Sequence, residues 1–225
     1  RTVAEAGTTA DRFIDATLEL IAEEGGSQDV NLRQVARRVG CAHTNAYNYF
    51  GSYEELLWAA FRRALRDYGE YLIHDLDPSL SRAEYIRRVV TNLATYPARN
   101  QGLYRFIGSD PIDLERIPTD ILDSVTSMKE WLFRVVETVV APARDFGDAE
   151  RIANIVLAYI DGETLNLING RVVPGEDVAG RVIENALSLI DVLGAVGPTG
   201  LPTSGGDRSD VPYPVLDLSE VERGS

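Results

Sequence analysis

Apolar residues recur every three to four positions along most of the chain, the spacing that places them on one face of an α-helix. The first such face, at Phe13, Ile14, Leu18 and Ile21, is followed by two glycines, which commonly end helices. No stretch alternates apolar and polar residues as a half-buried strand does. The pattern therefore predicts an all-α fold, with helices over residues 10–24, 31–39, 43–50, 52–75, 81–96, 99–108, 118–140, 148–169 and 176–194.

The starts of two helices are specified in detail. Asn31 is a favourable N-cap residue, and Gln34 stands three positions later, where its side chain can return a hydrogen bond to the cap. Ser52 and Glu55 repeat this spacing. Gly40 ends the short helix that Asn31 begins and permits a left-handed turn. Two short helices joined across such a turn indicate a helix-turn-helix unit, whose second helix enters the major groove of DNA.

Composition divides the chain into three parts. Residues 1–52 form a three-helix domain that contains the helix-turn-helix unit, and residues 53–194 form a larger helical domain. Prolines are expected to separate helices within it, for example after residue 96. Residues 195–225 are rich in Gly, Pro, Ser and Asp and predict an extended tail. Within this tail, residues 212–216 either dock on the body or belong to a mobile end.

The charge balance opposes nucleic-acid binding except at one place. The chain has 35 acidic and 22 basic residues and a formal net charge of -13. An acidic protein repels DNA, so a DNA-binding surface requires a local exception. Between Asn31 and Tyr53 the sequence holds Arg33, Arg37 and Arg38 and no acidic residue. Positive charge is thus concentrated on the proposed helix-turn-helix unit.

Other features exclude several classes of site. One cysteine, Cys41, and two histidines are too few for a closed zinc site, so we expect no structural metal and no cofactor. No apolar run is long enough to span a membrane, and the first residues lack the pattern of a secretory signal. We therefore expect a cytoplasmic protein with no membrane partner. Cys41 and His43 are the one pair that suggests catalysis, and both lie in the proposed turn and second helix, so we expect no enzyme.

The run from Phe13 to Phe61 is similar to the DNA-binding domain of TetR-family transcriptional regulators. The resemblance is carried by NLRQVARRVGCAHTNAYNYFGSYEELLWAAF, with a short helix ending in glycine and a second helix ending in an aromatic run. Three departures stand out. Ala42 replaces the serine that usually caps the second helix, Thr44 replaces a common glycine, and Tyr53 replaces a common lysine.

The resemblance implies roles for the residues of this segment. Ala46 and Phe50 would anchor the second helix, with Tyr47 either projecting to DNA or packing in the core. Side chains near the helix start would reach base edges, and later ones would contact phosphates. The expected base-reading residues are Arg33, His43, Thr44 and Asn45; the expected phosphate contacts are Tyr47, Asn48, Tyr49, Ser52 and Tyr53.

The resemblance also implies that the second domain binds a small effector and forms a homodimer. The helices over 148–169 and 176–194 are apolar on more than one stripe, as expected for burial against both the domain and a partner. A two-fold dimer suits a palindromic double-stranded operator. The expected dimer residues are Ile152, Val156, Ile160, Val182, Ala186 and Ile190. The candidate effector residues are Tyr96, Tyr104, Phe106, Met128, Trp131, Tyr159, Glu163 and Asn166.

Two readings of the function stay open. The first is a homodimeric regulator, a repressor that a lipophilic or aromatic effector releases from its operator. The second is an effector-binding helical module whose DNA binding is weak or lost, which the net charge of -13, Ala42 and Tyr53 suggest.

Overall fold

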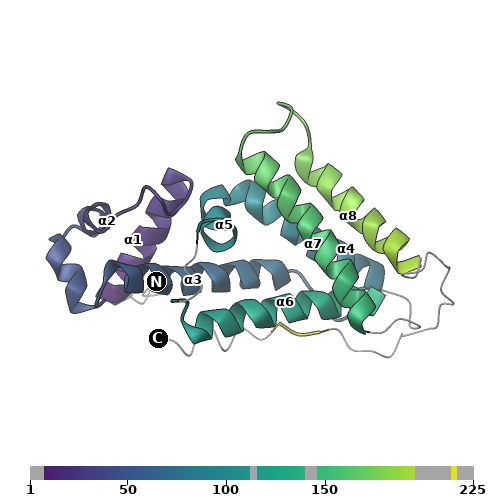
Figure 1. The fold of residues 1–225 in the computed structure, drawn as a ribbon, viewed down its shortest axis with the longest axis horizontal. Coiled ribbons are helices and arrows are strands. Elements are labelled where there is room, and N and C mark those ends of the chain that lie inside the picture. Colours follow the sequence, from purple (N-terminus) through teal and green to yellow (C-terminus); the bar gives the residue numbers. More distant parts are fainter. Residues whose placement is uncertain (1–7, 112–115, 140–145, 196–213, 217–225) are drawn as a thin grey trace, which may run out of the picture.

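A computed structural model of the chain describes residues 8–111, 116–139, 146–195 and 214–216. The described residues contain helices and no strand, which confirms the predicted all-α class. Figure 1 shows an elongated molecule with a small group of helices at one end and a larger group at the other. The helices are α1 (Thr9–Glu24), α2 (Leu32–Val39), the 3-10 helix η1 (His43–Asn48), α3 (Tyr53–Ile73), α4 (Arg82–Arg99), α5 (Gln101–Gly108), α6 (Thr119–Val139), α7 (Phe146–Ile168) and α8 (Val178–Ala195).

The sequence signals for the first helices correspond to hydrogen bonds in the structure. The Asn31 side chain accepts from the amides of Arg33 and Gln34, and the Gln34 side chain accepts from the Asn31 amide, which completes the predicted capping box. Ser52 caps α3 by accepting from the Glu55 amide at 3.1 Å. Each cap satisfies amides that have no partner within the helix, so these helices begin where predicted.

The predicted end of the fourth helix is wrong. Pro97 was expected to end the fourth helix near residue 96, but α4 continues to Arg99 with Pro97 inside it. Proline removes a single hydrogen bond, and in the last turn the helix recovers quickly: the Asn100 amide donates to the Tyr96 carbonyl at 2.9 Å. A buried Pro97 in the last turn is therefore compatible with the helix.

The larger group of helices is built around α4, which packs against α6, α7 and α8. Its buried side chains include Val89, Val90 and Leu93, and they meet Val135 of α6 and Ile160 of α7 in one apolar core. Burial of such side chains from water is the main favourable contribution to folding. This core holds the larger group of helices together.

A piece of the predicted tail lies against this core. The Pro214 carbonyl accepts hydrogen bonds from the Tyr85 hydroxyl at 3.3 Å and from the Trp131 indole at 3.2 Å. Leu216 is buried among the core residues. These contacts correspond to the docked alternative for residues 214–216; the rest of the predicted tail, residues 196–213 and 217–225, lies outside the described residues.

The helix α3 runs from the first group of helices into the second (Figure 1). Near its middle, Arg62 binds both carboxylate oxygens of Asp120 on α6, with Nη2 3.1 Å from Oδ1. A second seam joins α5 to α1. There the amide and hydroxyl of Ser27 donate to Asp110 at 2.7 and 2.5 Å, and Gly102 lies directly against the end of α1. The Ser27–Asp110 seam thus fixes the first three helices to α5, and Arg62 fixes α3 to α6.

Candidate functional site

The turn between α2 and η1 has the geometry that the sequence predicted. Gly40 has a φ of 82°, in the left-handed region that favours glycine. The amide of Gly40 donates to the carbonyls of Ala36 and Arg37, and the amide of Cys41 donates to Ala36 at 3.0 Å. These bonds satisfy the last carbonyls of α2 and redirect the chain sharply. The two short helices therefore form a helix-turn-helix arrangement, which with α1 we call the head.

The second short helix is shorter than predicted. It is a 3-10 helix over His43–Asn48 instead of a helix reaching Phe50, and its N-cap Ala42 makes no side-chain hydrogen bond. Ala46 is buried, and the Phe50 ring meets Phe13 edge to face with centroids 6.4 Å apart. A 3-10 helix is usually only a few residues long because its hydrogen bonds have poorer geometry than those of an α-helix. Packing of Ala46 and Phe50 thus holds η1 in place of a cap.

The outer face of η1 is open to solvent. His43, Thr44 and Asn48 are exposed, and Asn45 is half-buried. The Asn48 amide group donates to the Asn45 side-chain oxygen at 2.8 Å. The two amides predicted to meet DNA therefore bond to each other here, and this bond uses one of the two lone pairs of the Asn45 oxygen.

The two tyrosines of η1 and its end are also exposed. Tyr47 is 54% and Tyr49 47% exposed, which places Tyr47 at the surface and not in the core. The Tyr49 ring also packs against Phe13 at 6.1 Å between centroids. Tyrosine hydroxyls at such positions can donate to phosphate oxygens.

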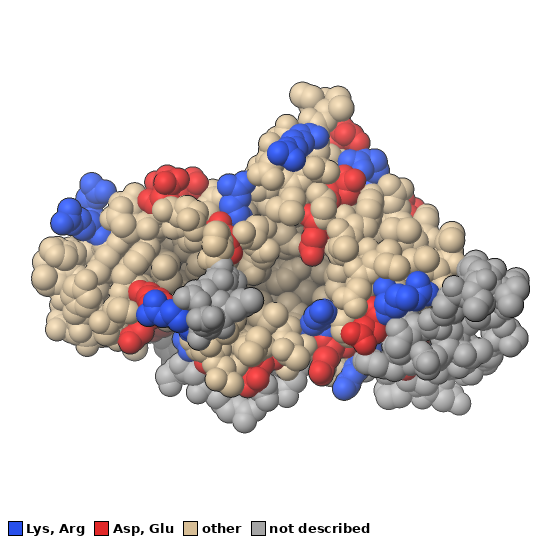
Figure 2. Space-filling view, viewed as in Figure 1, with Lys and Arg blue, Asp and Glu red and all other residues tan. Residues whose placement is uncertain are grey.

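The three arginines of α2 differ in their availability. Arg38 binds Glu23 at 2.5 Å and Glu19 at 3.2 Å, both on α1, and these carboxylates raise the pKa of its guanidinium. Arg33 and Arg37 are exposed and form no ion pair within the part of the chain that the structure describes. Figure 2 shows basic and no acidic side chains at the outer end of the head on this face. Two arginines are therefore free to meet an anionic partner.

The start of α3 differs from the prediction for Ser52 and Tyr53. The Tyr53 hydroxyl donates to the Val30 carbonyl at 2.9 Å inside the head, and burial raises its pKa to about 12. The Ser52 hydroxyl caps the helix, and the Glu55 carboxylate accepts from the Gly51 amide at 2.7 Å. The Tyr53 side chain is therefore not presented to a phosphate, and a carboxylate occupies the position where an anion was expected.

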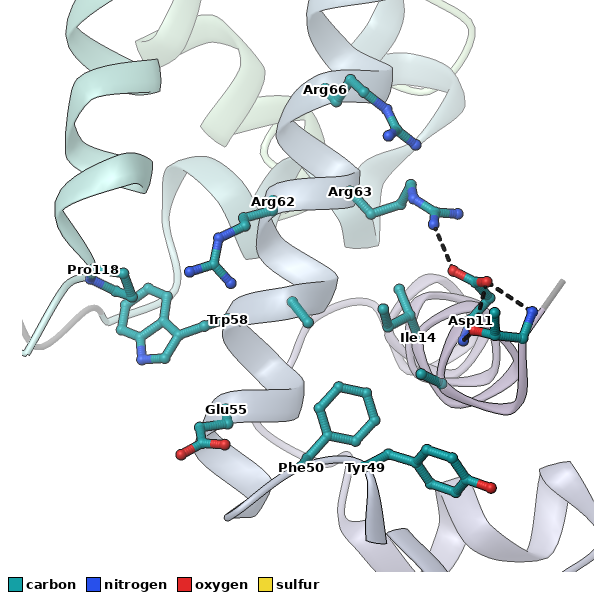
Figure 3. A pocket seen from close by; sticks show the side chains of 13 residues that line it. Asp11, Ile14, Tyr49, Phe50, Glu55, Trp58, Arg62, Arg63, Arg66 and Pro118 are labelled. Carbon is teal, nitrogen blue, oxygen red and sulfur yellow. Dashed lines mark hydrogen bonds and ion pairs between the residues drawn. The ribbon is translucent and has the colours of Figure 1, made fainter. Parts of the chain in front are cut away.

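A groove lies behind the head, between α1 and α3. It has a volume of about 670 Å³, and Figure 3 shows Tyr49 and Phe50 at one end and Arg62, Arg63 and Arg66 along α3. Arg63 binds Asp11 of α1 at 3.2 Å. The Tyr49 hydroxyl extends away from α3 (Figure 3). The contacts along this groove thus attach the head to α3, and they leave the outer face of η1 exposed.

The eight candidate effector residues do not form one group. Phe106 packs on Phe61 near the head, and Trp131 donates to the tail carbonyl. Tyr159 accepts from Asn185, and Glu163 binds Arg181 at 2.9 Å, both on α8. Tyr96 and Tyr104 do meet, with ring centroids 6.5 Å apart. The remaining two are Met128, buried on α6, and Asn166, half-buried on α7.

Tyr96 and Tyr104 belong to a larger cluster that sequence analysis missed. Tyr68 of α3 lies 4.7 Å from Tyr96 and 6.1 Å from Tyr104 between ring centroids. The Tyr104 hydroxyl donates to Asp161 of α7 at 2.6 Å. Loss of hydration raises the pKa of the Asp161 carboxyl, against the effect of this hydrogen bond. We call Tyr68, Tyr96, Tyr104 and Asp161 the tyrosine–aspartate cluster. Its members come from four helices, so no local sequence pattern predicts it.

The six predicted dimer residues require a correction. Ile152, Val156 and Ile160 of α7, and the corresponding positions of α8, are all buried in the core of this one chain. Their side chains pack against α4 and α6 or between α7 and α8 and are not available to a partner. Apolar residues on α7 and α8 that are exposed include Ile155, Leu165 and Val192. The six residues that were wrongly assigned to a dimer interface are Ile152, Val156, Ile160, Val182, Ala186 and Ile190.

Two further observations bear on membranes and metals. Among the described residues, no helix has the length and apolar character needed to cross a bilayer. The same residues contain no group of three His, Cys, Asp or Glu side chains arranged to hold a metal ion.

Comparison with known proteins gives a partial match in sequence and an extended match in structure. No protein-family model matches the chain. The HTH-type transcriptional regulator BetI of Brucella anthropi is 35% identical over 72 residues, which cover 32% of this chain and 34% of BetI. The match thus spans about a third of that relative.

Solved structures match over most of the chain. A TetR-like transcriptional regulator from Rhodococcus sp. RHA1 has a TM-score of 0.58 at 18% identity, covering 86% of this chain and 96% of that one. The fatty acid degradation regulator FadR from Bacillus halodurans has a TM-score of 0.63 at 17% identity, covering 83% and 96%. Over more than four fifths of its length, the chain therefore has the all-α fold of TetR-family transcriptional regulators.

Proposed function

We propose that the chain is a DNA-binding transcriptional regulator of the TetR type. The observation that carries the proposal is the exposed outer face of η1, flanked by two unpaired arginines on an otherwise acidic protein. His43, Thr44 and Asn48 are exposed, and packing within the described part of the chain does not explain their position. A helix-turn-helix unit with this face outward presents polar side chains to a major groove and cations to the phosphates.

In this proposal the roles of the head residues are unequal. Arg33 and Arg37 would supply the attraction to DNA, because Arg38 is already neutralised by α1. Thr44, His43 and Asn45 would reach base edges, and Tyr47, Asn48 and Tyr49 would contact the backbone. Ser52 would contribute through backbone amides at the start of α3 at most, because its hydroxyl is used as a cap.

The protein would act as a homodimer through the outer faces of α7 and α8. Ile155, Leu165 and Val192 are exposed there, and Gly162 has no atom within 4 Å of the position of an added Cβ. Figure 1 shows α7 and α8 side by side at the edge of the body. Exposed apolar residues on two adjacent helices suit a self-complementary interface, and a two-fold axis suits a palindromic operator.

The body would control the head through α3. This helix begins beside η1 and carries Tyr68 of the tyrosine–aspartate cluster, about 22 Å further along at 1.5 Å per residue. A small lipophilic or aromatic effector bound at the cluster would favour one placement of α3 over another. DNA affinity would fall by the difference in its binding free energy to the two states, which is the action of a repressor released by its effector.

Gel retardation of DNA from upstream of the chain's own gene tests the proposal. We expect retention at low salt that weakens with Asn45→Ala, because Asn45 lies on the face that meets the bases. Gln101→Ala, which removes an exposed amide on α5, is the matched control and should leave retention unchanged. Absence of retention at any salt concentration would favour an effector-binding module without DNA binding.

A further inference from the structure

The tyrosine–aspartate cluster presents a carboxylate beside aromatic rings with no cation to neutralise it. Asp161 is exposed on one side and accepts a single hydrogen bond, from Tyr104 at 2.6 Å. Within the described part of the chain, no arginine or lysine forms an ion pair with it. An unpaired carboxylate in partly desolvated surroundings favours the approach of a positive charge.

Two of the tyrosine hydroxyls in the cluster also lack a hydrogen-bond partner among the described residues. Tyr68, Tyr96 and Tyr104 are 91% or more buried, yet among the described residues the hydroxyls of Tyr68 and Tyr96 have no hydrogen-bond partner. Their rings lie within 4.7 to 6.5 Å of one another between centroids. Neither oxygen is among the buried side-chain atoms that lack a partner, so both are accessible from solvent, where another molecule can meet them beside the carboxylate.

The surface is open at this position. Figure 2 shows that the face is hollowed between α5 and α7, above the end of α3, and these are helices that carry the cluster. Asp161 is exposed, whereas the tyrosines lie deeper. A ligand entering from solvent therefore meets the carboxylate first and the aromatic rings behind it.

These features select one class of ligand. An anion would face Asp161 with no base to receive it, and a neutral apolar molecule would leave the carboxylate desolvated without a partner. A cation gains from the carboxylate and from the negative faces of the tyrosine rings, an interaction that strengthens when water is excluded. Burial and neighbouring acidic groups raise the pKa of Tyr104, so its hydroxyl stays protonated and orients Asp161.

We propose that the tyrosine–aspartate cluster binds the positively charged group of an organic ammonium ligand, with Asp161 as the counter-ion and Tyr68, Tyr96 and Tyr104 as the aromatic wall. The inference rests on the proposed function in that this ligand would be the effector of the regulator. It narrows the effector from any aromatic or lipophilic molecule to one that carries a permanent or pH 7 positive charge.

Isothermal titration calorimetry of the full chain tests the ligand class with three probes of similar size. The probes are benzyltrimethylammonium, neutral benzyl alcohol and anionic benzoate. We expect the ammonium to bind at least tenfold more tightly than the alcohol, and benzoate to bind more weakly still. Equal binding of ammonium and alcohol, or no binding of the ammonium, would overturn the proposal.

A substitution pair then tests the site. Asp161→Asn keeps the shape and the Tyr104 contact and removes the charge, so ammonium affinity should fall about tenfold while alcohol affinity stays the same. Asp191→Asn removes an exposed carboxylate from α8 and should change neither value, which controls for net charge. Unchanged ammonium affinity in Asp161→Asn, with circular dichroism showing a folded protein, would place the cation elsewhere and refute the assignment.

DNA binding is measured separately, so the two proposals can fail independently. Ammonium binding in a protein that never retards DNA would leave the cation site standing and refute the regulator. Retention of DNA by a protein that binds none of the probes would refute the cation site alone.

Discussion

Replacement of Gly102 by alanine is expected to destabilise the seam between head and body. An ideal Cβ at Gly102 would lie 2.4 Å from the Ile21 carbonyl oxygen, 3.0 Å from the Ala22 Cα and 3.1 Å from the Ala22 oxygen. All three are backbone atoms near the end of α1, so no side chain can rotate away. The helix α5 has to move away from α1, which strains the neighbouring Ser27–Asp110 bonds.

The size of the effect follows from two opposing contributions. Overpacking of a close contact costs about 1–3 kcal/mol, and the gain of alanine over glycine within a helix offsets about 0.5–1 kcal/mol. A net loss of about 1–2 kcal/mol corresponds to a fall in melting temperature of roughly 2–8 °C for a chain of this size. Gly108→Ala is the control in the same helix, because its nearest atom is the Tyr104 ring at an ordinary 3.8 Å.

Urea unfolding followed by circular dichroism at one protein concentration measures both variants against the parent. We expect a lower midpoint for Gly102→Ala with an unchanged slope, and a midpoint for Gly108→Ala equal to or above the parent value. A Gly102→Ala variant as stable as both others would show that α5 does not press on α1, and the seam would lose its role in seating the head.

Further predictions concern single contacts. Arg62 lowers the pKa of Asp120, so this pair should contribute about 1 kcal/mol of stability at neutral pH, which is lost as the pH falls below the ordinary Asp value of 3.8. Asp120→Asn should therefore reduce the free energy of unfolding by that amount at pH 7 and by little at pH 2. An equal loss at both pH values would contradict this prediction. Ile155→Asp should shift the chain from dimer to monomer in analytical ultracentrifugation, and an undisturbed dimer would move the interface away from the outer face of α7. Tyr53→Phe should cost about 1 kcal/mol in stability through its lost hydrogen bond, whereas Tyr47→Phe should weaken DNA retention without changing stability; the opposite outcome would reverse their assigned roles.

Local signals in the sequence predicted most of the fold. The Asn31–Gln34 capping box and the left-handed Gly40 are short-range features, and both occur as predicted because their bonds join residues only a few positions apart. The wrong end predicted for α4 also has a local cause. A proline ends a helix or is tolerated in it according to its place in the helix, and the sequence does not show that Pro97 falls in the last turn. Apolar periodicity identified α7 and α8 as helices with more than one buried stripe.

Periodicity did not show what each stripe packs against. Ile152 and Val182 were assigned to a partner because their helices are apolar on several sides, but the structure buries them within the chain. The cluster was missed for a related reason, since Tyr104 and Asp161 are 57 residues apart in the chain. Tyr53 was assigned to phosphate by its place in a motif, and its bond to Val30 depends on how the head folds. Contacts between distant residues were therefore the part that pattern alone did not supply.

If the head binds DNA through Arg33 and Arg37, its affinity for DNA from upstream of the chain's own gene has to fall as the salt concentration rises. Fluorescence anisotropy at several salt concentrations gives the slope of log affinity against log salt. We predict a clear negative slope that becomes about one unit shallower in Arg33→Ala and stays unchanged in Arg38→Ala, because Arg38 is paired with Glu19 and Glu23. Equal slopes in the parent and Arg33→Ala, or no binding at any salt concentration, would show that the head does not bind DNA in this way.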